Sequence, residues 1–210
     1  MSPTRRALLA AALPVALAPA LIRPALAADA PAANDPRLAP RALGKPDAKV
    51  TVEEWFSLTC PHCAQFAIKV LPEIRTKLID TGRIRYVFCD YPLDRVSLMA
   101  AQVARSLPAE RYEPFIMALL SNQDHWAFVQ DGSQEEQLRK MAALAGMSAD
   151  SFDRAVNDTQ LQNAIMSGEH RAQTQYNITG TPAFRFNNDV YRDGELTYAE
   201  FEKKVVAAGG

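Results

Sequence analysis

Two stretches of alternating apolar and polar residues predict β-strands in the first half of the chain, at Val50 to Ser57 and at Arg83 to Tyr91. A period of two is typical of a strand that buries one face. The apolar positions on the shared faces are Val50, Val52 and Phe56 in the first stretch and Ile84, Tyr86 and Phe88 in the second.

The segment between them, from Thr59 to about Thr81, has the spacing of a helix. Its apolar face holds Cys63, Phe66, Ala67, Val70, Ile74 and Leu78. Pro72 should kink this helix because proline has no N–H to donate, and Gly82 is a suitable end. A strand, a helix and a strand in this order predict a parallel pair of strands.

From Leu93 to about Tyr176 the pattern is helical. The expected helices are Ser97–Leu107, Arg111–Leu120, one that follows Ser133 and ends near Gly146, a short one capped by Ser148, and a long one over Leu161–Tyr176. Ser133-Gln134-Glu135-Glu136 matches a capping box, in which a serine and the third residue after it satisfy each other's backbone N–H groups.

The last part of the chain predicts a β-hairpin and a closing helix. Pro182–Phe186 and Val190–Tyr191 flank Asn187-Asn188-Asp189, residue types that tolerate a positive φ, and the helix runs from Thr197 to Ala208. The whole order is βαβ, a set of helices, then αββα. This order resembles a thioredoxin fold of the α/β class, with residues 41–92 and 161–208 as its two parts and residues 93–160 as a helical domain inserted between them.

The first residues predict export. Arg5 and Arg6 precede a short apolar run, and small residues at Ala25 and Ala27 suit a signal peptidase. We expect a signal peptide over residues 1–27, cleaved near Ala27, and a flexible leader over residues 28–40. The paired arginines resemble a twin-arginine (Tat) signal, with an ordinary secretory signal as the alternative.

Composition adds two constraints. The formal net charge of −1 gives no basic patch, so we expect no nucleic-acid partner. Three cysteines, Cys60, Cys63 and Cys89, are too few for a disulfide scaffold. Two of them are so close in sequence that a bond between them would close almost no loop, which favours reversible redox chemistry in an oxidising compartment.

The position of the pair explains how it would react. Cys60 should be the N-cap of the helix, Pro61 its first residue and Cys63 its third. The free N–H groups of His62 and Cys63 and the helix dipole would then stabilise a thiolate, and a protonated His62 would add to this. We therefore expect the pKa of Cys60 to lie below the ~8.5 of a free cysteine. A stabilised reduced form makes the disulfide an oxidant.

Two other uses of a CxxC pair are a metal site and a static disulfide. A zinc or copper site would need two more ligands, and Cys89, His125 and His170 are isolated along the chain. We expect no metal and no cofactor beyond the Cys60–Cys63 disulfide. The two histidines are interpreted as surface or helix-end residues.

Phe56-Ser57-Leu58-Thr59-Cys60-Pro61-His62-Cys63-Ala64-Gln65-Phe66 resembles the active-site segment of DsbA-like thiol:disulfide oxidoreductases. The resemblance extends through Tyr91-Pro92-Leu93 to Thr179-Gly180-Thr181-Pro182-Ala183-Phe184. It implies a periplasmic enzyme that donates disulfides to newly exported, cysteine-containing proteins. It also implies reoxidation by a DsbB-like, quinone-linked membrane partner.

The same resemblance assigns two supporting sites. It implies that Pro182 is cis and faces the cysteine pair, so that the backbone of Thr181 meets an extended substrate; the alternative is a trans proline that starts an edge strand. Threonine at position 181, where DsbA has valine, departs from the DsbA pattern.

Glu54 matches a buried glutamate of DsbA and would accept the proton of Cys63. Its place on the apolar face with Val52 predicts a raised pKa, unless it reaches solvent or a lysine.

Three residues and two alternative functions complete the sequence-based picture. Cys89 is interpreted as a buried or half-buried free thiol, with a resolving role or pairing to another chain as alternatives. Trp55 is expected in the core, with substrate contact as the alternative, and Trp126 is expected inside the inserted helical domain. Thr181 favours an isomerase or reductase as the second candidate function, and a holdase or metal carrier is the third. A monomer is expected, because residues 28–45 are too short for the dimerisation domain of known isomerases.

Overall fold

The computed structural model describes residues 35–210. The expected signal peptide and most of the expected leader lie outside the described residues. Within them, no helix is both long and apolar enough to cross a lipid bilayer.

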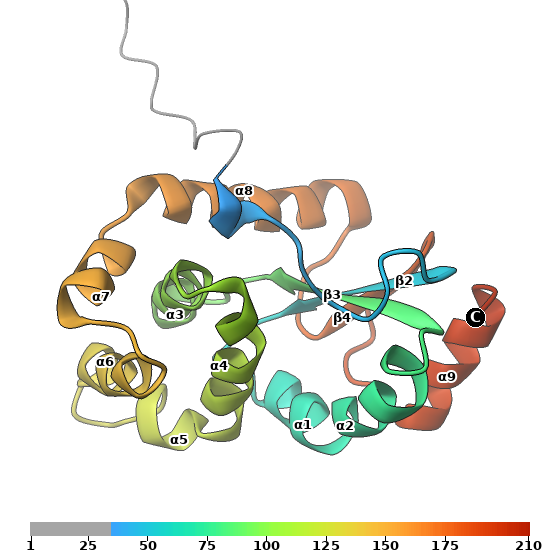
Figure 1. Ribbon diagram of the computed structural model, residues 1–210, viewed down its shortest axis with the longest axis horizontal. Coiled ribbons are helices and arrows are strands. Elements are labelled where there is room, and N and C mark those ends of the chain that lie inside the picture. Colours follow the sequence, from blue (N-terminus) through green and yellow to red (C-terminus); the bar gives the residue numbers. More distant parts are fainter. Residues whose placement is uncertain (1–34) are drawn as a thin grey trace, which may run out of the picture.

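A five-stranded sheet lies at the centre of the molecule (Figure 1). Its strands are β1 (Arg41–Leu43), β2 (Val50–Phe56), β3 (Ile84–Asp90), β4 (Ala183–Phe186) and β5 (Asp189–Tyr191), in the spatial order β1-β3-β2-β4-β5. The expected parallel pair is present, since β2 and β3 run parallel while the other three pairings are antiparallel. The central strand β2 therefore has a partner on each side.

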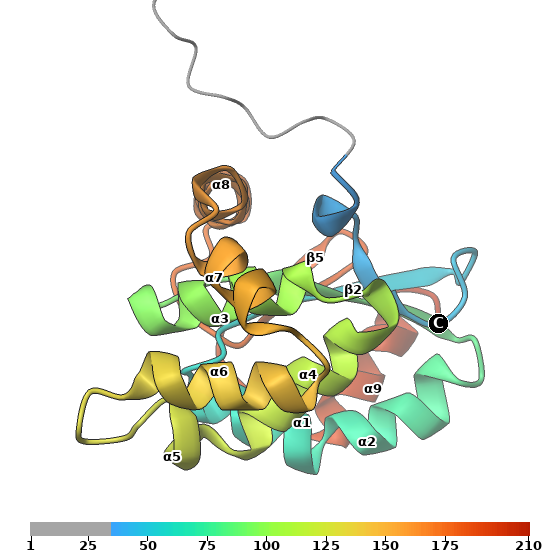
Figure 2. The ribbon, with the colours of Figure 1, turned by 60° about the vertical axis from the view of Figure 1, so that its left-hand side comes forward.

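Helices cover both faces of the sheet. On one face lie α1 (Pro61–Lys69), α2 (Leu71–Ile74), the π-helical turn η2 (Arg75–Ile79) and α9 (Tyr198–Ala207), and across the other runs α8 (Thr159–Tyr176). The remaining helices form a block beside the sheet: α3 (Arg95–Ser106), α4 (Ala109–Ser121), α5 (Gln123–Trp126), α6 (Gln134–Leu144) and α7 (Ala149–Val156). In Figures 1 and 2 this block lies on the side of the sheet away from α9, and α8 packs against α3 of the block through Ala101, Leu161 and Ile165. The α/β thioredoxin fold with inserted helices is confirmed.

The alternation in β2 and β3 buries one face of each strand against α1 and α9. The six apolar positions named above belong to one core cluster with residues of these helices. Aromatic rings fill the contact, with Phe66 of α1 4.8 Å from Phe184 of β4 between ring centroids. Phe201 of α9 lies 5.0 Å from Phe186. The period-two pattern thus indicated which faces of the strands are buried.

The helix expected over Thr59–Thr81 is broken as well as kinked. Helix α1 ends at Lys69, a new turn begins at Leu71, and a π-helical turn follows. Pro72 is the physical cause, because it cannot donate the hydrogen bond that would continue α1. Gly82 adopts a φ of +77°, which permits the chain to leave the helix there.

The prediction of a capping box at Ser133 is wrong. Ser133 has φ −84° and ψ 20° and makes no side-chain cap bond, and its hydroxyl donates to Asp131 Oδ1 at 2.6 Å. A capping box requires an extended N-cap residue. Thr197, with φ −69° and ψ 161°, meets this condition and forms a complete box with Glu200 at the start of α9. The same motif was present there in the sequence and was missed.

The fold begins earlier than the sequence suggested. Pro36–Leu38 form a 3-10 turn, and the Arg37 guanidinium lies 2.7 Å from the carboxylates of both Asp35 and Asp158. Strand β1 was not predicted, because three residues are too few to show an alternation. The expected hairpin is present, with Asn187 at a φ of +53° in its turn.

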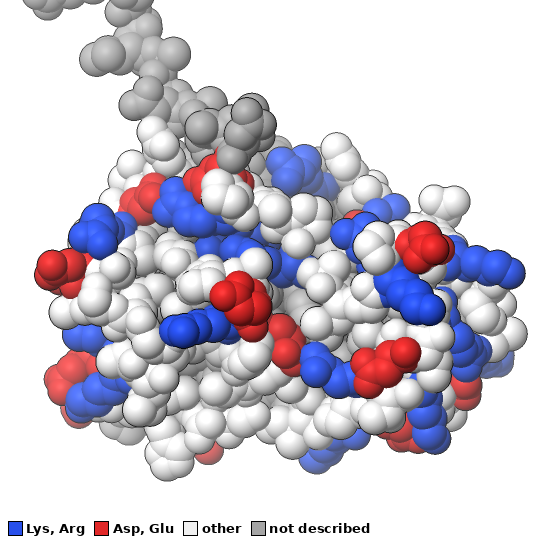
Figure 3. Space-filling model, viewed as in Figure 1, with Lys and Arg blue, Asp and Glu red and all other residues white. Residues whose placement is uncertain are grey.

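Acidic and basic side chains are interspersed on the face shown in Figure 3. This mixture agrees with the near-zero formal net charge of the sequence.

Candidate active site

The cysteine pair lies where β2 leads into α1. Cys60 is the N-cap residue with an extended backbone, and its carbonyl accepts the N–H of Ala64 at 3.1 Å as the first helical bond. Pro61 is the first helical residue. The predicted placement is therefore confirmed. It results from a proline that suits the first turn and a strand that ends at Phe56.

Both cysteines are free thiols with different surroundings. Hydrogen bonding from the Cys63 thiol is the largest cause that lowers the pKa of Cys60, to about 5, against the opposing effect of burial. The Thr181 side chain and the backbone N–H groups of Cys63 and His62 add to this lowering. Cys60 is only 4% exposed and Cys63 is fully buried. Burial raises the pKa of the Cys63 thiol well above its ordinary value. These opposite pKa shifts favour an anion at Cys60 and a neutral thiol at Cys63 in the reduced protein at neutral pH.

The peptide bond between Thr181 and Pro182 is cis, as expected, and the Thr181 carbonyl lies beside Cys60. As a thiol, Cys60 donates to the Thr181 carbonyl oxygen at 3.3 Å. A thiolate cannot make that bond. The buried Thr181 hydroxyl has no hydrogen-bond partner among the described residues, so it is available to donate to the anion. Threonine in place of valine therefore adds a donor at this sulfur.

His62 lies on the outside of the helix start, with its side chain 67% exposed. Its Nδ1 is 3.0 Å from Glu195 Oε1, in the loop before α9. This carboxylate is the main cause that raises the pKa of His62, and the Cys60 thiolate contributes. Protonation of His62, which the sequence left open, is thus favoured by an acid that the sequence analysis did not identify, since 133 residues separate the pair.

Glu54 is buried beneath the pair, as expected, and does not reach a lysine. Its Oε2 accepts the hydroxyl of Tyr86 at 2.6 Å. Burial raises the pKa of Glu54 to about 7, the Tyr86 hydroxyl opposes this, and the Cys60 charge adds to it. Glu53 points to the other face and pairs with Arg185 at 2.6 Å. The alternation of the strand had indicated this difference.

Side chains from the inserted helices hold the turn that carries the pair. Gln123 donates to the carbonyl oxygens of Leu58 at 2.8 Å and Cys60 at 3.1 Å. Thr59 donates to Asp94 Oδ2 at 2.6 Å. The sequence analysis missed these residues because a glutamine in a helix carries no local signal of what it will contact.

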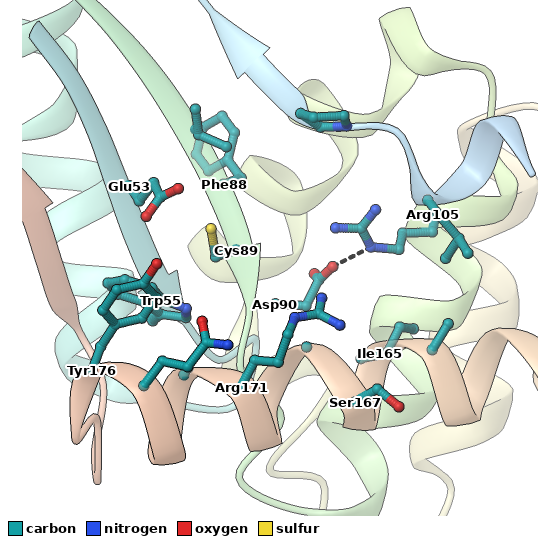
Figure 4. Close-up of a pocket in the computed structure, with 17 residues that line it drawn as sticks. Glu53, Trp55, Phe88, Cys89, Asp90, Arg105, Ile165, Ser167, Arg171 and Tyr176 are labelled. Carbon is teal, nitrogen blue, oxygen red and sulfur yellow. Dashed lines mark hydrogen bonds and ion pairs between the residues drawn. The ribbon is translucent and has the colours of Figure 1, made fainter. Parts of the chain in front are cut away.

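The remaining candidates lie away from the pair. Cys89 is a half-buried free thiol, as expected, and burial raises its pKa well above the ordinary value. It lines a pocket beside α8 (Figure 4), and it lies opposite Trp55 of β2, hence on the other face of the sheet from Glu54. His125 and His170 are exposed helix residues. No group of three or more potential metal ligands occurs within residues 35–210. Trp55 and Trp126 are buried, as predicted.

Comparisons with known proteins agree with this geometry. The crystal structure of Wolbachia pipientis alpha-DsbA1 superposes with a TM-score of 0.72 and 28% identity, covering 81% of this chain and 90% of that one. The thiol:disulfide interchange protein DsbA of Pectobacterium carotovorum is 28% identical over 141 residues, which are 65% of each chain.

A Rickettsia felis protein named as a protein-disulfide oxidoreductase is 30% identical over 146 residues. The match covers 69% of this chain and 52% of that protein, so this chain spans about half the length of the Rickettsia relative. The family model described as Thioredoxin matches residues 37–206, nearly the whole described part. We conclude that the chain belongs to the thioredoxin family and that it resembles the DsbA proteins within that family.

Proposed function

We propose that this chain is a periplasmic thiol–disulfide oxidoreductase that donates the Cys60–Cys63 disulfide to exported proteins. The observation that carries the proposal is the contrast between the two sulfurs. One is stabilised as a thiolate at a helix N-terminus and the other is a buried neutral thiol above a carboxyl group. A stable Cys60 thiolate favours the reduced protein and so makes the disulfide an oxidant.

The reaction needs two exchanges. A substrate thiolate attacks Cys60 Sγ of the oxidised pair, a substrate–Cys60 disulfide forms, and Cys63 leaves as a thiolate. Cys63 takes a proton from Glu54, whose pKa near neutrality suits both directions of transfer. A second substrate thiolate then attacks the substrate sulfur, and Cys60 leaves as a stable thiolate. The substrate loses two electrons to become a disulfide, and the cysteine pair gains them.

The surface beside the pair supports a protein substrate. The Thr181 carbonyl lies next to Cys60 and precedes a strand, so an extended peptide can pair with this backbone. We propose unfolded, cysteine-containing exported proteins as substrates and a DsbB-like membrane protein as the reoxidant. The chain acts as a monomer in this proposal. The signal over residues 1–27 directs it to the periplasm, and the twin-arginine (Tat) pathway is the favoured export route.

An isomerase or reductase is the second candidate, because the residue before the cis proline is Thr181, whose buried hydroxyl has no hydrogen-bond partner among the described residues. The equilibrium of the pair with glutathione and the repair of scrambled ribonuclease would separate the two. An oxidase forms disulfides in reduced ribonuclease quickly and repairs scrambled ribonuclease poorly.

The direct test is the oxidation of reduced ribonuclease by the chain without residues 1–27. Cys60→Ser and Cys63→Ser should abolish turnover. Cys89→Ser is the matched control and should keep it, because that thiol lies on the other face of the sheet from Glu54. Full activity of the Cys60→Ser variant would refute the proposal, and a wild-type protein that keeps reduced ribonuclease in solution without oxidising it would favour a non-enzymatic holdase.

A further inference from the structure

Tyr86 is a buried titratable residue that the proposed exchange steps do not use. It lies on β3, directly opposite Val52 of β2, while Glu54 lies opposite Phe88. Residues two apart on a strand point to the same face, so Tyr86 and Glu54 are diagonal neighbours on the face that packs against α1. Their oxygens are 2.6 Å apart, and both side chains are almost completely buried.

The surroundings of this pair are otherwise apolar. The Tyr86 ring lies 5.2 Å from that of Phe88 and 6.4 Å from that of Phe201. The titratable groups that act on the two side chains are each other, Cys60 and Cys63 at the start of α1, and Cys89 of β3. A carboxylate in such a place loses its water and needs a donor.

Tyr86 supplies that donor over the whole working range of pH. Burial raises the pKa of its hydroxyl well above 10, so the hydroxyl stays protonated. It stabilises the ionised form of Glu54 and therefore lowers the pKa of Glu54, against the larger effect of burial. Without the hydroxyl, Glu54 would remain protonated to a higher pH.

We propose that Tyr86 is a positioning residue whose hydroxyl keeps the Glu54 carboxylate ionised near Cys63 and thereby sets the pH range in which Glu54 can take the Cys63 proton. This inference rests on the proposed function. When Cys63 attacks a mixed disulfide at Cys60, its proton passes to Glu54. The Cys63 sulfur then bonds to Cys60, and the other thiol leaves. In the opposite direction Glu54 returns the proton to Cys63.

The test compares the wild-type protein with Tyr86→Phe, which removes one oxygen and keeps the ring. Carbon-13 NMR of the side-chain carboxyl groups, with Glu54→Gln to assign the signal, follows the ionisation of Glu54 in the reduced protein. A hydrogen bond to a charged group corresponds to a pKa shift of about one unit or more, so the Glu54 midpoint should rise by about that amount. This measurement does not depend on enzymatic activity.

The kinetic arm follows the oxidation of the reduced protein by glutathione disulfide. Attack by Cys63 on the mixed disulfide should be about tenfold slower at pH 6 in Tyr86→Phe, because a one-unit shift leaves about a tenth as much ionised Glu54. The two rates should converge near pH 9. In the Glu54→Gln background, Tyr86→Phe should change neither the rate nor its pH dependence.

Tyr112→Phe is the matched control, because Tyr112 is equally buried and donates to a different carboxylate, Asp90, at 3.1 Å. It should leave the Glu54 titration unchanged. If Tyr86→Phe does not fold, 3-fluorotyrosine at position 86, a stronger donor, should lower the Glu54 midpoint instead.

An unchanged Glu54 midpoint in Tyr86→Phe would overturn the inference, as would an equal slowing with and without Glu54. If the wild-type protein performs no exchange at all, the proposed function fails, while the NMR result still decides whether Tyr86 controls Glu54.

Discussion

The low pKa of Cys60 predicts a specific dependence of stability on pH. Replacing Cys60 by serine removes a group that is ionised in the folded protein at neutral pH and protonated in the unfolded chain. Folding lowers the pKa of this thiol from 9.0 to about 5. An acid whose pKa is lowered by folding stabilises the protein at higher pH, and this stability is lost as the pH falls through the folded value.

The size of the effect follows from these two values. Between pH 5 and pH 9 the folded protein holds the thiolate while the unfolded chain holds the thiol. Each pH unit in this window adds about 1.4 kcal/mol to the free energy of unfolding, so the thiolate contributes roughly 3 kcal/mol at pH 7. The same energy makes the disulfide about 60 mV more oxidising than an identical pair with an ordinary thiol.

Urea unfolding under reducing conditions from pH 4 to pH 8 would measure the contribution of the Cys60 thiolate to the free energy of unfolding. The difference in unfolding free energy between the wild-type protein and Cys60→Ser should be constant below pH 5. Above pH 5 it should rise by about 1.4 kcal/mol per pH unit. Cys63→Ser is the matched control, because its hydroxyl can still donate to the Cys60 sulfur, and its curve should follow the wild type. A difference that stays flat from pH 4 to pH 8 would refute the assignment of a stabilised thiolate.

Three further outcomes are expected. Because burial raises the pKa of Glu54 from 4.5 to about 7, ionisation of Glu54 destabilises the folded protein. Glu54→Gln should therefore raise the free energy of unfolding, measured in urea, by up to ~3 kcal/mol at pH 8 and by little below pH 4.5. Thr197→Ala should cost about 1 kcal/mol in the same assay because it removes a helix cap, whereas Ser133→Ala should cost nearly nothing; equal losses would contradict the cap assignment. Glu195→Gln should lower the midpoint of His62 in a proton NMR titration, and an unmoved midpoint would argue against that ion pair.

The sequence by itself determined the parts of this protein that depend on near neighbours. Alternation with a period of two indicated β2, β3 and their buried faces, including the inward direction of Glu54. A strand followed by Cys-Pro-His-Cys placed one sulfur at a helix start, because proline favours the first turn and leaves the next N–H groups free. Local steric and hydrogen-bonding rules operate over three or four residues, so a sequence displays them directly.

Only the tertiary structure decided which distant groups meet at the sulfurs. Thr181 lies 121 residues from Cys60, and Glu195 lies 133 residues from His62. Tyr86 was recognised as a core position, but its hydroxyl could have met water, a carbonyl or a carboxylate until β3 was placed beside β2. The same limit applied to the two capping motifs, because the backbone angles of Ser133 and Thr197 depend on the loops that lead into their helices. Packing sets these contacts, since a polar group that folding removes from water must bond to whichever partner the fold brings near.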